Sequence, residues 1–211
     1  MKNCLIITDI QNDFCPGGAL AVAGGNEIIP IVNSLAQKFD KVVATQDWHP
    51  PGHVSFAATH NKKPYDIISL GDGQQVLWPV HCVQGSPGAD FHEDLDLRPV
   101  DLIIRKGNDL NIDSYSTFME NDKKTLTGLH SYLQGFAIQD LYFCGLATDY
   151  CVYYSALDAR NMGFNVSVIL DACRGLDVPA GNIAATVQAM KERGIRIMNH
   201  NEALSWLRLS L

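Results

Sequence analysis

Three side chains of reactive type, Asp9, Lys106 and Cys151, each follow a short apolar run of the kind that forms a buried strand. In a parallel sheet covered by helices, ligands bind beyond the carboxyl ends of the strands. The sequence therefore predicts that a carboxylate, an ammonium and a thiol meet in one crevice. Such a set could perform nucleophilic catalysis, with the thiol as nucleophile and the carboxylate as base.

Cys151 lies in the stretch Cys144-Gly-Leu-Ala-Thr-Asp-Tyr-Cys151, which indicates a strand, a tight turn and the first turn of a helix with Thr148 as N-cap. Free N–H groups and the positive end of the helix dipole would stabilise a thiolate there. Cys151 is therefore a candidate nucleophile. The alternative is a buried cysteine that only fills space, as most free cysteines do.

Asp9 and Lys106 have simple alternatives of their own. Asp9 begins the segment Asp9-Ile-Gln-Asn-Asp-Phe14, where it could accept the thiol proton or could merely form an Asx turn. Lys106 could hold the thiolate and the carboxylate in place, or could be a solvated lysine at the end of a strand. No fixed spacing joins these residues, so only their shared position after strands links them.

A second group of residues has the composition of a metal site. Asp47 and His49 are two apart in Thr-Gln-Asp-Trp-His, so they point the same way if the preceding strand continues. With His81 they make a two-histidine, one-carboxylate set that suits Zn²⁺, Fe²⁺ or Mn²⁺ and leaves positions open. His53 and His60 lie nearby as further candidates, and each histidine has a surface or hydrogen-bonded role as its alternative.

Alternating strand and helix patterns predict the α/β fold that would bring these residues together. The predicted strands are Cys4–Ile7, Lys41–Thr45, Asp101–Arg105, Asp140–Cys144, Asn165–Leu170 and Ile195–Met198. The predicted helices are Glu27–Phe39 after Asn26 as N-cap, Asp149–Asn161, Ile183–Arg193 ended by Gly194, and Glu202–Leu209. Alternation of this kind implies right-handed crossovers and a parallel sheet covered on both faces.

Two connections are too long for this simple pattern. Residues 46–100 separate the second and third strands and contain most of the Pro, His and Trp. A connection of that length is usually functional or has small elements of its own. Residues 107–124 form a second polar insertion, followed by a helical pattern at Thr125–Gly135. We interpret residues 1–211 as one domain with a metal-site insertion around residues 46–100.

Composition excludes several classes of partner. The chain has 211 residues, of which 46% are hydrophobic and 18% charged, with a net charge of −7, as in an ordinary folded domain. An acidic surface repels phosphate backbones, so we expect no nucleic-acid partner. The longest apolar runs are far below the roughly 20 residues of a membrane helix, and Met1–Thr8 lacks the pattern of a secretory signal. We therefore expect no membrane partner, and a cytoplasmic protein with reduced cysteines.

Six sequence blocks together resemble the nicotinamidases (pyrazinamidases), a family within the isochorismatase-like cysteine hydrolases. The blocks are Asp9-Ile-Gln-Asn-Asp-Phe-Cys-Pro-Gly-Gly, Thr-Gln-Asp47-Trp-His-Pro, Trp78-Pro-Val-His-Cys-Val-Gln-Gly, Arg105-Lys-Gly, Asp113-Ser-Tyr-Ser and Gly145-Leu-Ala-Thr-Asp-Tyr-Cys-Val. The resemblance covers nearly the whole chain. It implies a three-layer α/β/α domain with a six-stranded parallel sheet, in which the first and fourth strands are neighbours.

The resemblance also implies an activity and roles for residues. The activity is hydrolysis of nicotinamide to nicotinate and ammonia through a cysteine thioester, a step of NAD salvage, with pyrazinamide as a further substrate. The implied triad is Asp9, Lys106 and Cys151; the oxyanion hole is the N–H groups of Ala147 and Cys151, beside a cis Leu146–Ala147 peptide; the metal ligands are Asp47, His49 and His81; and the aromatic walls of the substrate pocket are Phe14, Trp78 and Tyr115. The metal would be zinc, with iron or manganese as alternatives, and would meet the pyridine nitrogen. The role of His53 is left open.

Three other functions stay open at this point. One is cysteine hydrolysis of a carbamoyl or ureido compound, as in metal-free relatives, and another is vinyl ether hydrolysis, against which Cys151 argues. The third is a non-catalytic metal- or ligand-binding protein that retains the fold, since a fold alone never proves an activity. The oligomeric state is not legible from the sequence, and a homo-oligomer is among the options.

Overall fold

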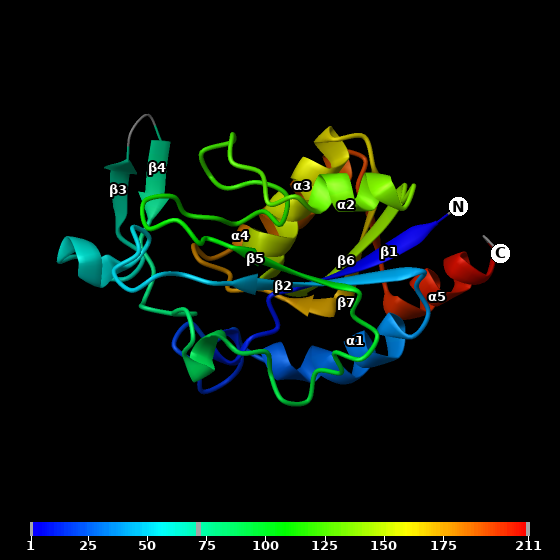
Figure 1. Cartoon of the computed structure of the whole chain (residues 1–211), viewed down its shortest axis with the longest axis horizontal. Helices are drawn as coiled ribbons and strands as arrows, with labels where there is room; N and C mark the ends of the chain where they lie inside the picture. Colours follow the sequence, from blue (N-terminus) through cyan, green and yellow to red (C-terminus); the bar gives the residue numbers. More distant parts are fainter. Residues whose placement is uncertain (1, 71–72, 210–211) are drawn as a thin grey trace.

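The central sheet has six parallel strands in the order β5-β2-β1-β6-β7-β8 (Figure 1). The computed structural model describes residues 2–70 and 73–209. The strands are β1 (Asn3–Thr8), β2 (Lys41–Asp47), β5 (Leu102–Lys106), β6 (Asp140–Leu146), β7 (Asn165–Arg174) and β8 (Arg196–Met198). The predicted six-stranded parallel sheet is confirmed, and so is the neighbouring position of the first and fourth strands of this sheet, β1 and β6.

Buried apolar side chains explain why β1 lies in the middle of the sheet. Leu5, Ile6 and Ile7 are completely buried, as expected for a strand with helices on both faces. β1 pairs with β2 from Cys4 opposite Lys41 to Ile7 opposite Ala44. It pairs with β6 along its whole length. The carboxyl ends of three neighbouring strands therefore lie side by side.

Helices cover the sheet on both faces and complete the three layers predicted from the resemblance. The helices are α1 (Ile29–Ala36), α2 (Leu129–Gly135), α3 (Tyr153–Asn161), α4 (Asn182–Glu192) and α5 (His200–Leu209). In Figure 1, α1 and α5 lie below the sheet and α2, α3 and α4 lie above it. As predicted, α4 ends just before Gly194, which has a φ of 73° in the left-handed region.

The first helix differs from the prediction at both ends. Asn26 is not an N-cap, because it lies inside a 3-10 turn at Gly25–Ile28 that begins after the left-handed Gly24. α1 then runs only from Ile29 to Ala36, with Pro30 in its first turn. Proline is favoured there because the first N–H groups of a helix have no partner within the helix. The predicted boundaries Glu27–Phe39 were therefore too wide.

The long insertion contains small elements, as expected. An antiparallel hairpin pairs β3 (Ile67–Leu70) with β4 (Gly73–Val76). Short 3-10 turns form at Ala57–His60 and Pro87–Ala89. Single bridges join His49 to Val83 and Phe56 to Trp78, so the insertion folds back on itself beside the end of β2. The second predicted helix region, Thr125–Gly135, is helical only from Leu129, after the left-handed Gly128.

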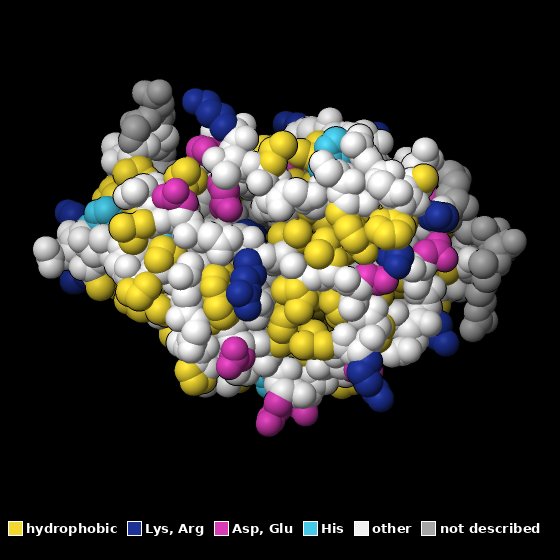
Figure 2. All heavy atoms as spheres, in the orientation of Figure 1, with side chains coloured by type: hydrophobic (Ala, Val, Ile, Leu, Met, Phe, Trp, Pro, Cys, Tyr) yellow, Lys and Arg dark blue, Asp and Glu magenta, His cyan; other side chains and the backbone are white. Residues whose placement is uncertain are grey.

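β5 is an edge strand, and its two faces differ. Ile103 and Arg105 are exposed, whereas Ile104 and Lys106 point into the protein. Figure 2 shows apolar side chains gathered around β5, between α2 and the chain below it. The strand therefore directs Ile103 and Arg105 outward and carries Lys106 inward. Within residues 2–70 and 73–209, no helix combines the length and the apolar character that crossing a bilayer requires.

Candidate active site

The predicted reactive residues all lie at the carboxyl edge of the sheet. Asp9 follows β1, Asp47 ends β2, Lys106 ends β5, and Cys151 lies just after β6. β6 approaches β1 closely here, because a Cβ on Gly145 would lie 2.1 Å from the Thr8 carbonyl oxygen. Gly145 also has a φ of 110°, which side chains rarely adopt. Only glycine therefore allows β6 to bring the Cys151 turn beside Asp9.

Lys106 connects the members of the proposed triad. Its Nζ lies 2.9 Å from Asp9 Oδ2 and 3.4 Å from the Cys151 sulfur. The same ammonium contacts the Asp47 carboxylate. The Cys151 sulfur and one oxygen each of Asp9 and Asp47 all lie within 4.8 Å of one another. The structure thus brings a thiol, a carboxylate and an ammonium within reach of one proton transfer.

Burial sets the resting protonation of this group. Burial raises the pKa of Asp9 and Asp47 adds to the rise, while Lys106 and the Thr45 hydroxyl act against it. For Lys106, burial acts against the charge, but Asp47 and Asp9 outweigh it and raise the pKa well above its usual value. Burial also raises the pKa of Cys151 well above that of an ordinary thiol, although Lys106 opposes this. Cys151 is therefore a thiol at rest that must lose its proton in order to react.

The local structure at Cys151 corrects the expectation that Thr148 is the N-cap of the helix. The segment Thr148–Val152 is a π-helical turn that continues into α3, and its N-cap is Ala147. Thr148 is consequently inside the turn and caps nothing. The wider turn arises because the Val152 N–H reaches back to the Ala147 carbonyl at 3.2 Å. The expected cis peptide between Leu146 and Ala147 is present.

The three predicted metal ligands form a compact buried cluster. One ligand atom from each of Asp47, His49 and His81 lies within 4.8 Å of the others. The Nε2 atoms of His49 and His81 are 3.6 and 3.8 Å from Asp47 Oδ2. Burial opposes the Asp47 charge, but Lys106 and His49 outweigh it and hold the pKa of Asp47 well below its usual value. Asp47 is therefore ionised, as an oxygen ligand of a metal ion would need to be.

Hydrogen bonds orient both histidines as a metal site requires. His49 Nδ1 donates to the Gly107 carbonyl at 3.0 Å, and His81 Nδ1 donates to the Pro79 carbonyl at 2.7 Å. A carbonyl oxygen only accepts, so Nδ1 carries a proton in each ring, and Nε2 is the atom that would offer its lone pair to a metal ion. Both lone pairs then belong to the atoms nearest Asp47. The donor set fits a divalent ion of the zinc, iron or manganese type.

His53 lies beside this cluster with both ring nitrogens occupied. Its Nδ1 is 2.8 Å from the Ser55 hydroxyl, and its Nε2 is 3.1 Å from the Ile112 carbonyl. The ring stacks on His49 with centroids 4.2 Å apart. Burial, helped by His49, lowers the pKa of His53 to about 4, so the ring is neutral. In this geometry the His53 ring packs against the His49 ring, and its nitrogens face Ser55 and Ile112 rather than Asp47.

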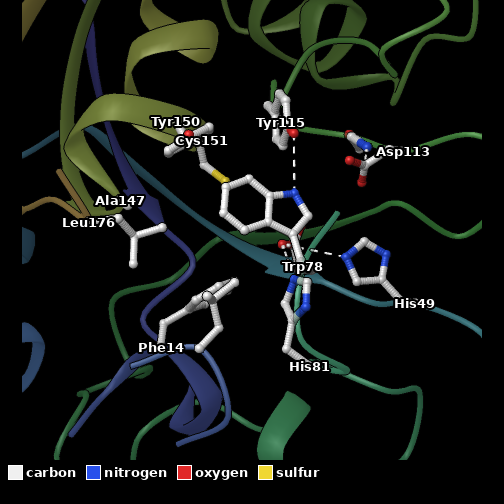
Figure 3. Close-up of a pocket in the computed structure, with 13 residues that line it drawn as sticks. Phe14, His49, Trp78, His81, Asp113, Tyr115, Ala147, Tyr150, Cys151 and Leu176 are labelled. Carbon is white, nitrogen blue, oxygen red and sulfur yellow. Dashed lines mark hydrogen bonds and ion pairs between the residues drawn. The ribbon is translucent and has the colours of Figure 1, made fainter. Parts of the chain in front are cut away.

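A narrow pocket opens onto the sulfur and the histidines (Figure 3). All of the predicted aromatic wall residues line this pocket, and so do all of the predicted oxyanion-hole residues and metal ligands. The full lining is Phe14, Leu20, Asp47, His49, Trp78, His81, Asp113, Ser114, Tyr115, Ala147, Tyr150, Cys151 and Leu176. Sequence reasoning assigned no role to Leu20, Tyr150 or Leu176. Asp113 and Ser114 belong to the sequence block Asp113-Ser-Tyr-Ser, and this block was the feature of the sequence that could have identified them as pocket residues.

Contacts between aromatic rings fix the walls of this pocket. The Trp78 indole N–H donates to the Tyr115 hydroxyl at 3.2 Å, as drawn in Figure 3. Trp78 also packs edge-on against Tyr150, with centroids 4.8 Å apart. On the other side, Phe14 lies 5.5 Å from the His81 ring. Flat aromatic faces that border a narrow pocket suit a flat ring as ligand.

Comparisons with known proteins agree with this arrangement. Residues 3–202 match the model of the isochorismatase domain. A nicotinamidase from Acinetobacter baylyi is 52% identical over 203 residues, which cover 95% of this chain and 94% of the relative. A solved nicotinamidase/pyrazinamidase from Acinetobacter baumannii superimposes with a TM-score of 0.94 at 48% identity, covering 96% of this chain and 98% of the other.

A third similar protein is a Pyrococcus horikoshii pyrazinamidase solved in complex with zinc. Its TM-score is 0.77 at 37% identity, and the match covers 94% of this chain and 99% of the other. The family expected from the sequence blocks is thus confirmed by both the domain match and the curated relative. This chain belongs to the isochorismatase-domain family and, within it, to the nicotinamidase/pyrazinamidase group of amide hydrolases.

Proposed function

We propose that this protein hydrolyses nicotinamide to nicotinate and ammonia through a thioester on Cys151. The observation that carries the proposal is the position of Lys106 Nζ, 2.9 Å from Asp9 and 3.4 Å from the Cys151 sulfur, where the sulfur borders an aromatic pocket. The named activity of the similar proteins supports the choice of an aromatic carboxamide as substrate.

In the first step, the Asp9 carboxylate takes the proton of Cys151 and the sulfur attacks the carboxamide carbon. The raised pKa of Asp9 makes it a better proton acceptor than an ordinary aspartate. Lys106 balances the negative charge that passes from the carboxylate to the sulfur. The N–H groups of Ala147 and Cys151 meet the charge that develops on the carbonyl oxygen, a contribution of about 3–4 kcal/mol per donor in comparable sites.

In the second step, Asp9 returns its proton to the leaving nitrogen. The carbon–nitrogen bond breaks, ammonia departs, and the acyl group stays on Cys151 as a thioester. Asp9, again a carboxylate, then removes a proton from water, and the hydroxide attacks the thioester carbon. The carbon–sulfur bond breaks, Asp9 returns its proton to the Cys151 sulfur, and the acid leaves and loses its own proton to become nicotinate. One water is consumed, and the protein returns to its starting state.

Asp47, His49 and His81 would hold the divalent metal, zinc first and iron or manganese as alternatives. Bound there, the metal supplies a Lewis-acid contact for the ring nitrogen of the substrate. Phe14, Trp78 and Tyr115 border the same pocket and exclude water from the ring. The ring is thereby oriented with its carboxamide toward Cys151. Pyrazinamide, which also has a ring nitrogen, is proposed as a second substrate.

Two other functions are less well supported. A metal-free hydrolase of ureido compounds has no use for the buried Asp47 cluster, in which both histidines have their Nδ1 atoms tied to carbonyls. A binding protein without activity does not require Lys106 to contact both the thiol and the carboxylate.

We further propose that the enzyme acts in the cytoplasm, in NAD salvage.

An assay of ammonia release tests the proposal directly. Purified protein should release ammonia from nicotinamide, lose this activity on chelation and regain it when zinc, iron or manganese is added. Cys151→Ala should abolish turnover while leaving the fold intact, and Cys15→Ala is a control at another buried thiol. Rapid quenching and mass spectrometry should detect the nicotinoyl adduct on Cys151. Unchanged turnover in Cys151→Ala would eliminate the thioester route.

A further inference from the structure

Glu120 is a buried carboxylate that no step of the proposed reaction uses. The residue is 6% exposed and lies outside the set that lines the substrate pocket. Burying a charge is costly unless strong partners surround it. Both carboxylate oxygens accept from a single backbone donor, the Gly107 N–H, at 3.3 and 3.2 Å. Glu120 is therefore hydrogen-bonded to Gly107, the residue directly after Lys106.

Gly107 links Glu120 to the metal cluster. Its carbonyl oxygen accepts the hydrogen bond from His49 Nδ1 at 3.0 Å. Its φ is 66°, and a Cβ at this position would lie 2.4 Å from the His49 ring. The ring thus packs directly on a left-handed glycine. Any rotation of Gly107 moves the acceptor that sets the direction of His49.

The sheet alone holds this part of the chain weakly. The pairing of β2 with β5 ends at Asp47 opposite Lys106, and one further bond joins the Trp48 N–H to the Lys106 carbonyl at 3.0 Å. Beyond that point Gly107 enters the polar insertion. Glu120 supplies the next restraint, from a separate turn in which the Glu120 N–H bonds the Thr125 carbonyl at 2.9 Å.

We propose that Glu120 is a positioning residue for the metal site. By holding the Gly107 N–H, it fixes the carbonyl that keeps His49 Nδ1 protonated and its Nε2 directed at Asp47. This inference rests on the proposed metal-dependent function. Groups that orient metal ligands usually change metal affinity by about 10- to 100-fold when they are removed.

The test compares substitutions of similar size at Glu120. Glu120→Met keeps the length of the side chain and removes the oxygen acceptor, whereas Glu120→Gln keeps one oxygen. Glu120→Ser is measured alongside, because its smaller side chain leaves room for water if methionine prevents folding. Asp122→Asn is the control, since Asp122 is an exposed carboxylate of the same loop that binds the Lys124 and Thr125 N–H groups at 2.9 Å.

Zinc affinity is measured by competition with a chromogenic chelator, and thermal midpoints are measured on the metal-free proteins. We expect the zinc dissociation constant to rise about 10- to 100-fold in Glu120→Met and Glu120→Ser, and to stay near the wild-type value in Glu120→Gln and Asp122→Asn. Excess zinc should restore turnover of Glu120→Met. Equal affinity in the methionine and glutamine variants would overturn the role of Glu120. Wild-type protein that bound no zinc, iron or manganese would instead overturn the metal part of the proposed function.

Discussion

The Lys106 ammonium contacts the Asp47 carboxylate, whose other oxygen lies 3.6 Å from His49 Nε2. One carboxylate therefore faces the triad on one side and the histidines on the other. All of these groups are buried. Lys106 offsets the repulsion between Asp9 and Asp47, because two carboxylates this close repel each other.

Substituting Lys106 with methionine should therefore reduce both stability and activity. The change keeps the chain length but leaves two buried carboxylates without their cation, and breaking a buried pair costs about 3–5 kcal/mol. We expect a fall of that size in the free energy of unfolding measured with urea, and loss of ammonia release. Lys38→Met, at an exposed lysine, is the control. Equal stability of the two variants would contradict the central role of Lys106.

The pH dependence of kcat/KM should report the environment of Asp9. Asp9 accepts a proton only as a carboxylate, so activity is lost as the pH falls through its pKa. Burial, helped by Asp47, raises this pKa, and the loss should thus begin at a higher pH than for an ordinary aspartate.

The Thr45 hydroxyl donates to Asp9 Oδ1 at 2.5 Å and lowers the pKa of Asp9. Thr45→Val should therefore shift the acid limb of the profile to still higher pH, whereas Thr45→Ser, which keeps the hydroxyl, should leave it in place. The full kcat/KM profile of each variant is the measurement. Coincident acid limbs in the valine and serine variants would rule out this hydrogen bond as a determinant.

The metal cluster should discriminate between rings with and without a nitrogen. Benzamide has the shape of nicotinamide but offers no ligand to an ion held by Asp47, His49 and His81. We expect kcat/KM for benzamide to be lower by at least about 10-fold, since losing one such contact costs more than 1.4 kcal/mol. The comparison uses metal-loaded enzyme, and equal values for the two amides would refute contact between ring and metal.

Gln11 should stabilise the folded protein by holding the backbone of Asp47. Its Nε2 donates to the carbonyls of Asp47 and Ala89, both at 2.8 Å, and its Oε1 accepts from the Asp47 N–H at 2.8 Å. Gln11→Glu would place a carboxylate oxygen against two carbonyl oxygens. We expect a loss of about 1–3 kcal/mol in urea unfolding. Gln139→Glu, at an exposed glutamine, should have little effect, and equal losses in the two variants would argue against this role of Gln11.

The sequence predicted the sheet and the starts of its strands well, because buried parallel strands are short, continuous apolar runs, but β7 runs on to Arg174, past the predicted end at Leu170. Asp9 and Lys106 could be located from this pattern, since each follows or ends such a run. The protonation state of Cys151 could not be predicted from the sequence. Its protonation depends on burial and on Lys106, which is 45 residues away in the chain.

Residues in the insertions were the hardest to predict. Glu120 has no strand or helix pattern around it, and its partner Gly107 is 13 residues away. Leu20 and Leu176 enter the pocket from loops, where apolar periodicity carries no information about direction. The hairpin of β3 and β4 was missed for a related reason, because Ile67–Leu70 is mostly exposed and shows no buried face.

The hydrogen bond between Trp78 and Tyr115 joins the two insertions directly to each other. The width of the pocket is consequently set by loops rather than by the sheet that carries the reacting groups. Loops tolerate replacement far better than a buried parallel sheet does. The range of amides that the pocket accepts can thus evolve, or be engineered, by exchanging loop residues while the reacting groups on the sheet stay unchanged.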